Sequence, residues 1–114
     1  MTKLQEYTNG GFELNEPDYH FNDIYFVCTC GSFPEQYECY IIDTEGKKFQ
    51  VGYVRLRGGY LTCQFPDVGC ETIYEYLFES KIGLFRTENE RLFHLDIISS
   101  IICNKLVNIG VFID

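Results

Sequence analysis

Two cysteines separated by one residue, Cys28 and Cys30, are the clearest candidates for a chemical role in this chain. They end an apolar run and are followed by a glycine, which lets the backbone bend. Cys63 and Cys70 form a second pair on either side of a predicted turn. Structural zinc sites use four such ligands in a tetrahedron. The sequence therefore predicts a structural zinc site made by Cys28, Cys30, Cys63 and Cys70. Cys28 and Cys30 would share one face of a strand, and Cys63 and Cys70 would lie diagonally on one face if the turn closes a hairpin.

Other assignments for these side chains stay open. Common zinc motifs place two or more residues between paired cysteines, whereas the first pair here has one. Cysteines outside disulfides are often buried like small apolar residues, which also suits Cys39, Cys63 and Cys103. If Cys39 lies opposite the first pair in a hairpin, it is a reserve ligand. His20 and His94 are the nitrogen alternatives, although each also suits a surface or half-buried position.

Motifs for catalysis are missing from the sequence. A cysteine nucleophile needs a histidine base and an orienting group, and the chain has two histidines in no recognisable frame. The sequence contains no G-x-S-x-G elbow, phosphate-binding glycine loop or H-E-x-x-H motif. We therefore expect a protein that is not an enzyme. A small enzyme with one exposed thiol is the alternative, and alkylation of the accessible cysteines would distinguish the two.

The composition predicts one soluble domain that spans residues 1–114. Hydrophobic residues make up 46% of the 114 residues and aromatic residues 17%, as in globular proteins. Residues 1–11 lack the basic start and apolar core of a secretory signal, and no apolar run reaches the roughly 20 residues that span a bilayer. We expect a cytoplasmic protein that does not bind membranes. A reducing compartment also favours metal binding or burial over disulfides for the six cysteines.

Negative charge is concentrated in the first part of the chain. Residues 1–46 contain nine carboxylates and one lysine, while residues 47–114 contain eight groups of each sign, so the whole net charge of −8 belongs to the first segment. Such a segment repels phosphate backbones, which argues against direct binding of nucleic acid. It favours a basic protein partner. The alternative is an acidic surface that serves only solubility.

Hydrophobic alternation predicts a β-rich body. Strands are expected at residues 24–30, 36–43, 49–57, 60–65 and 72–78, and a short final strand at 111–113. The two glycines at positions 58 and 59 predict a two-residue hairpin turn in which Arg57 faces Tyr60 and Val54 faces Cys63. Val54, Leu56, Leu61, Cys63 and Phe65 would then line the apolar face of this hairpin.

The opposite face of that hairpin carries a basic aromatic patch of Tyr53, Arg55, Arg57 and Tyr60. Arginine and tyrosine on a sheet can bind a phosphate or stack on nucleic acid bases. The same residue types are also enriched in protein interfaces. We therefore favour a solvated face or a protein interface for this patch.

One helix is predicted after the strands. Thr87 followed by Glu90 is a capping box, and Gly110 is a stop signal. Between them, apolar residues at helical spacing form one face, namely Leu92, Leu95, Ile98, Ile102 and Leu106. The predicted fold class is therefore α+β, an antiparallel sheet of about five strands packed against one C-terminal helix.

Three short segments, GYVRLR at residues 52–57, PDVG at 66–69 and ETIY at 71–74, resemble a group of small uncharacterised proteins of gut bacteria and their phages. The profile of a small acidic protein with cysteine-bound zinc is also similar to phage-encoded anti-CRISPR proteins. That resemblance implies an inhibitor in the host cytoplasm that binds a type II RNA-guided effector nuclease and obstructs its guide or target DNA, with zinc holding the inhibitor together. The alternative is an unrelated cytosolic interaction or immunity protein without metal.

Overall fold

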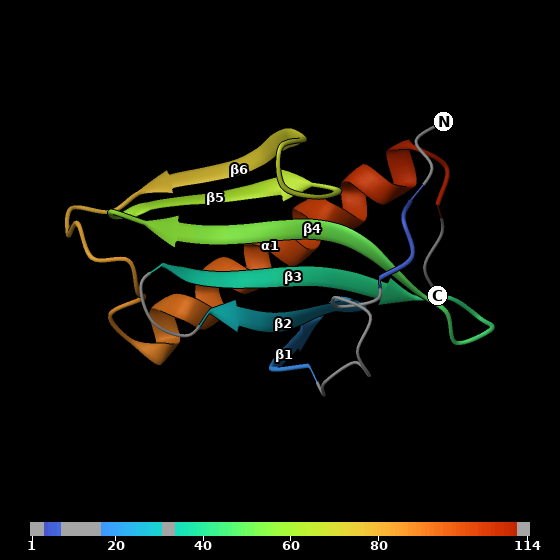
Figure 1. Ribbon diagram of the computed structural model, residues 1–114, viewed down its shortest axis with the longest axis horizontal. Helices are drawn as coiled ribbons and strands as arrows, with labels where there is room; N and C mark the ends of the chain where they lie inside the picture. The colour runs from blue at the N-terminus through green and yellow to red at the C-terminus, as the bar shows by residue number, and fades with distance from the viewer. Residues whose placement is uncertain (1–3, 8–16, 31–33, 112–114) are drawn as a thin grey trace.

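Six antiparallel strands and one helix form the fold in the computed structural model, which describes residues 4–7, 17–30 and 34–111. The strands are β1 (Tyr19–Phe21), β2 (Ile24–Cys30), β3 (Glu35–Ile42), β4 (Lys48–Arg57), β5 (Tyr60–Phe65) and β6 (Glu71–Leu77), and the helix is α1 (Glu88–Asn108). Each strand pairs with the next, so the sheet order follows the chain. Helix α1 crosses one face of this sheet (Figure 1). The predicted α+β class is confirmed, with six strands instead of about five.

The strand that sequence analysis missed is β1, at one edge of the sheet. It has only three residues, which is too short for a recognisable alternation. Its turn to β2 consists of Asn22 and Asp23, whose φ angles of 51° and 69° are left-handed. Asparagine and aspartate tolerate this conformation better than most residues. An Asn-Asp pair between Phe21 and Ile24 was therefore the available signal for this hairpin.

The predicted hairpin between β4 and β5 is confirmed residue by residue. Arg57 pairs with Tyr60 and Val54 with Cys63, and Gly58 and Gly59 form the turn with positive φ angles of 59° and 82°. The five apolar residues of the predicted inner face are all buried in the main core. Short-range signals were sufficient because both strands and the turn lie within one local segment.

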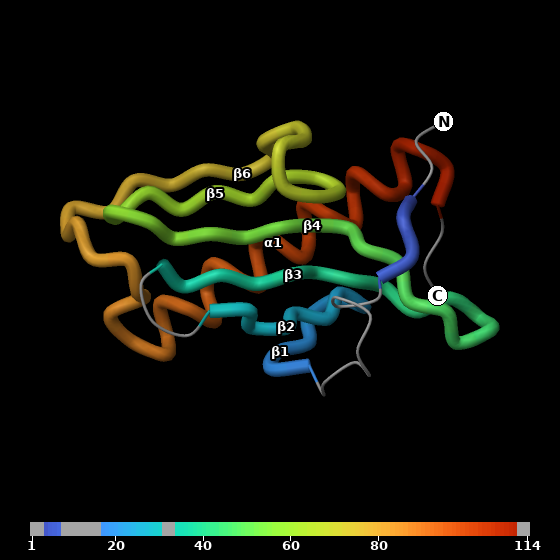
Figure 2. The backbone as a smooth tube through the Cα atoms, viewed as in Figure 1, coloured from blue at the N-terminus to red at the C-terminus, as the bar shows by residue number. Residues whose placement is uncertain are grey.

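Residues 4–7 run beside the first part of β4 and continue the sheet there (Figure 2). The N–H of Tyr7 donates to the carbonyl of Lys48 at 2.8 Å, and the N–H of Gln50 donates to the carbonyl of Gln5 at 2.9 Å. Tyr7 also stacks on Tyr40 with 4.9 Å between ring centroids. This segment therefore covers part of the sheet face that lies opposite α1.

Helix α1 begins and ends where the capping signals predict. Thr87 is the N-cap, and its hydroxyl accepts from the N–H of Glu90 at 3.0 Å. The Glu90 carboxylate accepts from the N–H of Arg86, one residue earlier than an ideal capping box requires. Gly110 follows the helix with a φ of 87°. The predicted final strand is not found at Val111, and residues 112–114 lie outside the described residues.

The core lies between α1 and the sheet. Leu95, Ile98, Ile102 and Leu106 are fully buried there, while Leu92 is half-buried. Gly52 on β4 allows the close approach of the helix, since a Cβ atom at this position would lie 3.0 Å from Cδ1 of Ile102. Within the described part of the chain, no helix is long and apolar enough to cross a membrane.

Candidate functional site

Cys28 and Cys30 lie at the end of β2, where the strand is irregular. Cys28 pairs with Tyr37, but a register shift follows and Cys30 pairs with Gln36. Neighbouring residues of a strand point to opposite faces, and directly paired residues share a face. The shift therefore breaks the alternation from which a shared face for these two cysteines was predicted.

The two cysteines of the second predicted pair differ in exposure. Cys63 is buried on β5, whereas Cys70 is exposed just before β6. Strands β3 and β4 separate Cys63 from Cys28, which corresponds to about 14 Å for three strand spacings. A Zn–S bond is about 2.3 Å long. The structure therefore does not bring Cys28 and Cys63 close enough to share one ion.

Burial also affects the protonation of these thiols. Burial raises the pKa of Cys63 to about 12 and raises the pKa of Cys39 well above its ordinary value. Burial, followed by the charge of Asp18, raises the pKa of Cys28. Each of these shifts favours the neutral thiol.

The reserve ligands are placed elsewhere. Cys39 pairs with Phe26 and not with Cys28. His20 stacks on Tyr25 with ring centroids 4.1 Å apart, and His94 lies beside β6. Among the residues that the structure describes, no group of three or more histidine, cysteine or acidic side chains could hold a metal ion.

The zinc site stays a prediction of the sequence, and elemental analysis of protein purified without chelator tests it. The sequence predicts one zinc ion per chain, which the Cys28→Ser/Cys30→Ser variant loses. Cys103→Ser is the matched control, because the new hydroxyl can donate to the Asn22 carbonyl as the thiol does. A metal-free chain that melts no lower than zinc-treated protein contradicts the prediction.

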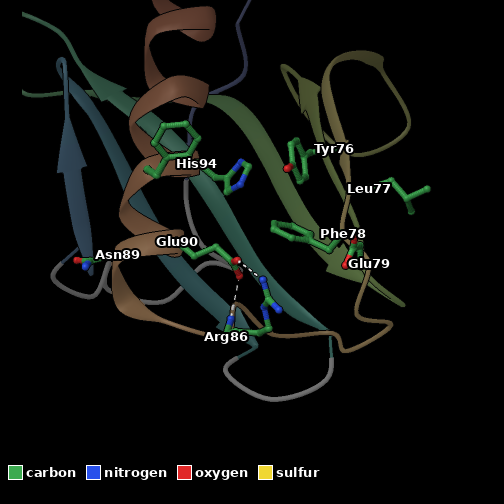
Figure 3. A pocket seen from close by; sticks show the side chains of 9 residues that line it. Tyr76, Leu77, Phe78, Glu79, Arg86, Asn89, Glu90 and His94 are labelled. Atoms are coloured by element: carbon green, nitrogen blue, oxygen red, sulfur yellow. Dashed lines mark hydrogen bonds and ion pairs between the residues drawn. The ribbon is translucent and has the colours of Figure 1, made fainter.

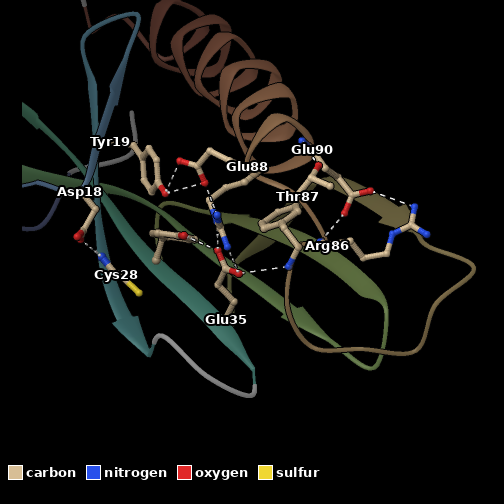
Figure 4. A network of polar contacts seen from close by, with 11 residues as sticks. Asp18, Tyr19, Cys28, Glu35, Arg86, Thr87, Glu88 and Glu90 are labelled. Atoms are coloured by element: carbon tan, nitrogen blue, oxygen red, sulfur yellow. Dashed lines mark hydrogen bonds and ion pairs between the residues drawn. The ribbon is translucent and has the colours of Figure 1, made fainter.

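A buried ion pair lies where β3 meets the first turns of α1 (Figure 4). The side chain of Glu35 is 2% exposed, and Arg91 donates to it from Nε at 2.7 Å and from Nη2 at 3.1 Å. The same carboxylate accepts from the hydroxyl of Tyr37 and from the N–H of Phe85 at 3.3 Å. Glu35 is one of the nine carboxylates of residues 1–46, but it is buried and fully hydrogen-bonded, so it adds no exposed negative charge.

The surroundings of this pair stabilise the ionised forms of both side chains. Burial alone would raise the pKa of Glu35, but the hydrogen bonds from Arg91, Tyr37 and Phe85 outweigh it and lower the pKa below its usual range. Hydrogen bonding to Glu35 raises the pKa of Arg91. A general acid or base works best with a pKa near the working pH. The pair therefore suits a structural link between β3 and α1.

Next to this pair, exposed carboxylates gather along β1 and α1. Asp18 and Asp23 flank β1, and Glu88 and Asp96 come from the helix. The Tyr19 hydroxyl donates to Glu88 at 3.2 Å. Asn22, which precedes Asp23, donates to Asp96 at 3.2 Å, while Asp18 accepts from the N–H of Cys28 at 2.7 Å. We name Asp18, Asp23, Glu88 and Asp96 the acidic edge.

A cleft of about 240 Å³ opens at the acidic edge. Asp18, Tyr19, Cys28, Tyr37 and the Glu35–Arg91 pair line it. The charge distribution along the chain indicated Asp18 and Asp23. It could not indicate Glu88 and Asp96, because they belong to a part of the sequence with equal numbers of both charges.

A second concavity of about 620 Å³ lies between β6 and the first half of α1 (Figure 3). The rings of Tyr76 and Phe78 lie 4.7 Å and 5.1 Å from the imidazole of His94. Nδ1 of His94 is 2.9 Å from the hydroxyl of Tyr74, and burial lowers the pKa of this histidine. His94 is therefore part of an aromatic wall.

The basic aromatic patch lies on the sheet face opposite α1, as the alternation predicts. Tyr53 and Arg55 alternate along β4 with buried residues that face the helix. Carboxylates are interspersed on the same face, since Glu38 pairs with Tyr53 and Glu75 accepts from the Tyr60 hydroxyl at 3.0 Å. The patch is therefore a mixed surface and not a continuous basic one.

No family model, curated protein or solved structure matches this chain. The candidate functional features are therefore the surfaces of the chain itself. Three of them stand out in the described part of the molecule, namely the acidic edge, the aromatic groove beside β6 and the mixed face of the sheet.

Proposed function

We propose that this chain is a protein-binding inhibitor whose acidic edge binds a basic protein surface. The target that we propose is an RNA-guided effector nuclease of the type II class. The single observation that carries the proposal is the acidic edge, where two segments far apart in sequence add their exposed carboxylates to one surface.

The local charges of this edge do not cancel. Two of its four carboxylates, Asp18 and Glu88, lie beside the Glu35–Arg91 pair, in which the guanidinium is already shared between Glu35 and Glu88. The surface therefore keeps an excess of negative charge. Such a surface attracts a basic partner over distances comparable to the Debye length and mainly raises the association rate.

The nuclease class fits this charge. RNA-guided nucleases hold the guide and target DNA in positively charged channels. A small acidic protein that binds in such a channel would compete with the phosphate backbone of the nucleic acid. Inhibition would then follow from occupancy and needs no chemical reaction by the inhibitor.

The proposal predicts that loss of charge at the acidic edge weakens inhibition. In the Asp23→Asn/Asp96→Asn variant we expect the association rate with a guide-loaded type II nuclease to fall roughly threefold to tenfold at low salt. Asparagine tolerates the left-handed backbone at position 23 and can still accept from Asn22 at position 96. Stopped-flow binding and DNA cleavage assays at several salt concentrations measure the effect.

The matched control is Glu45→Gln/Glu79→Gln, which removes the same charge from exposed positions outside the acidic edge. We expect it to retain nearly the full association rate. Equal losses in both variants would show that only net charge matters. If no nuclease is inhibited and the acidic edge instead binds a basic toxin, the chain is an immunity protein and the nuclease proposal fails.

A further inference from the structure

Strand β6 is an open edge of the sheet. The N–H of Phe78 donates to the carbonyl of Gly59 at 2.8 Å. In an antiparallel pair, residues alternate between those that bond to the neighbouring strand and those that do not. Tyr76 therefore bonds to β5, while Glu75 and Leu77 direct their N–H and C=O groups away from the sheet. No strand pairs with that side of β6 in the described part of the chain.

This edge has only part of the usual protection, namely two glutamates and a register irregularity at Cys63 and Gln64. Proteins shorten edge strands or place lysine or proline in them. The opposite edge strand, β1, has three residues, whereas β6 has seven and contains neither lysine nor proline. Its side chains are also exposed, with Tyr76 46% and Leu77 64% accessible. An edge of this kind suits the addition of an extended peptide as a new strand.

The aromatic groove lies on the helix side of the same edge. Tyr76 and Phe78 form one wall, and His94 faces them from α1 (Figure 3). Phe93 also lines the groove and is 61% exposed. A strand added to β6 would point alternate side chains to this face. The residues on either side of the one opposite Glu75 would therefore face the helix, and the one opposite Tyr76 would enter the groove, which favours an apolar side chain there.

The residue opposite Glu75 would lie on the other face of the sheet. Directly opposed side chains in antiparallel strands are about 5 Å apart at Cβ, and opposite charges stabilise such a pair. Glu75 therefore favours lysine or arginine at this position. A second copy of β6 offers no base, since its sequence is ETIYEYL.

We propose that β6 binds an extended segment of a partner protein as a seventh strand, and that this segment carries a lysine or arginine between two apolar residues. Both apolar residues face the helix, the one opposite Tyr76 enters the aromatic groove, and the basic residue pairs with Glu75. This surface is independent of the proposed function, because the acidic edge lies along β1 at the other side of the sheet.

Two synthetic peptides test the proposal with the full chain, Thr-Thr-Val-Lys-Val-Thr-Thr and the same peptide with Glu in place of Lys. We expect the lysine peptide to bind roughly threefold to tenfold more tightly in an NMR titration. The amide protons of Glu75 and Leu77 should exchange more slowly in the complex. Glu75→Lys should reverse the preference, whereas the matched variant Glu45→Lys at the exposed turn after β3 should keep it.

Leu77→Pro removes one outward N–H and leaves the bonds between β5 and β6 in place. It should weaken binding about tenfold, whereas Leu77→Ala keeps that donor and should weaken it less. Binding that is unchanged in Leu77→Pro, or no binding of either peptide to the wild type, overturns the proposal. So does a β6-dependent dimer in sedimentation velocity, because the occupant would then be a second copy. If Leu77→Pro does not fold, the reversal by Glu75→Lys decides.

Discussion

Arg91→Met is expected to lower the free energy of unfolding by about 3–5 kcal/mol, because it leaves the buried Glu35 carboxylate without its counter-charge. Glu35 cannot turn to solvent, since its side chain is 2% exposed and its backbone N–H is bonded to Gly83. Its remaining donors are the hydroxyl of Tyr37 and the N–H of Phe85. Urea unfolding followed by circular dichroism measures the loss.

Two further variants test whether the loss comes from the buried ion pair, and not from the removal of any arginine or from lost packing. Arg86→Met removes the exposed ion pair with Glu90, in which the arginine is 61% accessible, and should cost less than about 0.5 kcal/mol. Glu35→Gln/Arg91→Met keeps an acceptor for Tyr37 but removes both charges, so it should recover a large part of the loss. If the double variant is as unstable as Arg91→Met, lost packing and not charge is the cause.

The pH dependence of the free energy of unfolding tests the same ion pair. The folded-state pKa of Glu35 is lowered, so its stabilisation is complete above the ordinary carboxyl pKa and is lost as the pH falls through the folded value. In Arg91→Met the isolated carboxylate should instead have a raised pKa and bind a proton on acidification. The stability difference between wild type and Arg91→Met should therefore be largest at neutral pH and shrink as the pH falls from the raised carboxyl pKa of the variant towards the lowered pKa of the wild type.

Gly59→Ala is expected to destabilise the chain by roughly 2–3 kcal/mol or more, from a left-handed backbone and a steric clash. The φ angle of Gly59 is 82°, and a Cβ atom there would lie 2.2 Å from the carbonyl oxygen of Ser80. Because that contact is with backbone, relief requires the segment after β6 to move. Thermal unfolding measures the loss, and NMR shifts of residues 78–82 report the movement.

Gly58→Ala is the control for this prediction. Gly58 also has a positive φ of 59°, but a Cβ atom there would meet nothing within 4 Å. We expect it to cost only the conformational penalty, about 1–2 kcal/mol. Similar losses in the two variants would contradict the importance of the contact with Ser80.

Features that depend on neighbouring residues could be predicted from the sequence. The register of the β4–β5 hairpin followed from its glycine turn and its alternation, and both are local. The helix boundaries followed from Thr87 and Gly110 for the same reason. Strand β1 was not predicted because three residues and an Asn-Asp turn carry little periodicity.

Features that depend on residues far apart in the chain could not be predicted from the sequence. The burial of Glu35 could not be predicted because its partner, Arg91, is 56 residues away in the sequence. The shared face of Cys28 and Cys30 followed from regular alternation, but the register shift between them arises in the pairing of β2 with β3. No pattern within β2 alone indicates this shift.

The sequence by itself determined the α+β fold class, the confirmed hairpin and helix, and the unequal distribution of charge along the chain. Tertiary structure alone decided which carboxylates share a surface. Packing of α1 beside β1 adds Glu88 and Asp96 to the acidic edge, while the contact with Arg91 buries Glu35. The physical reason is that electrostatic interactions depend on distance in space, which chain order does not specify.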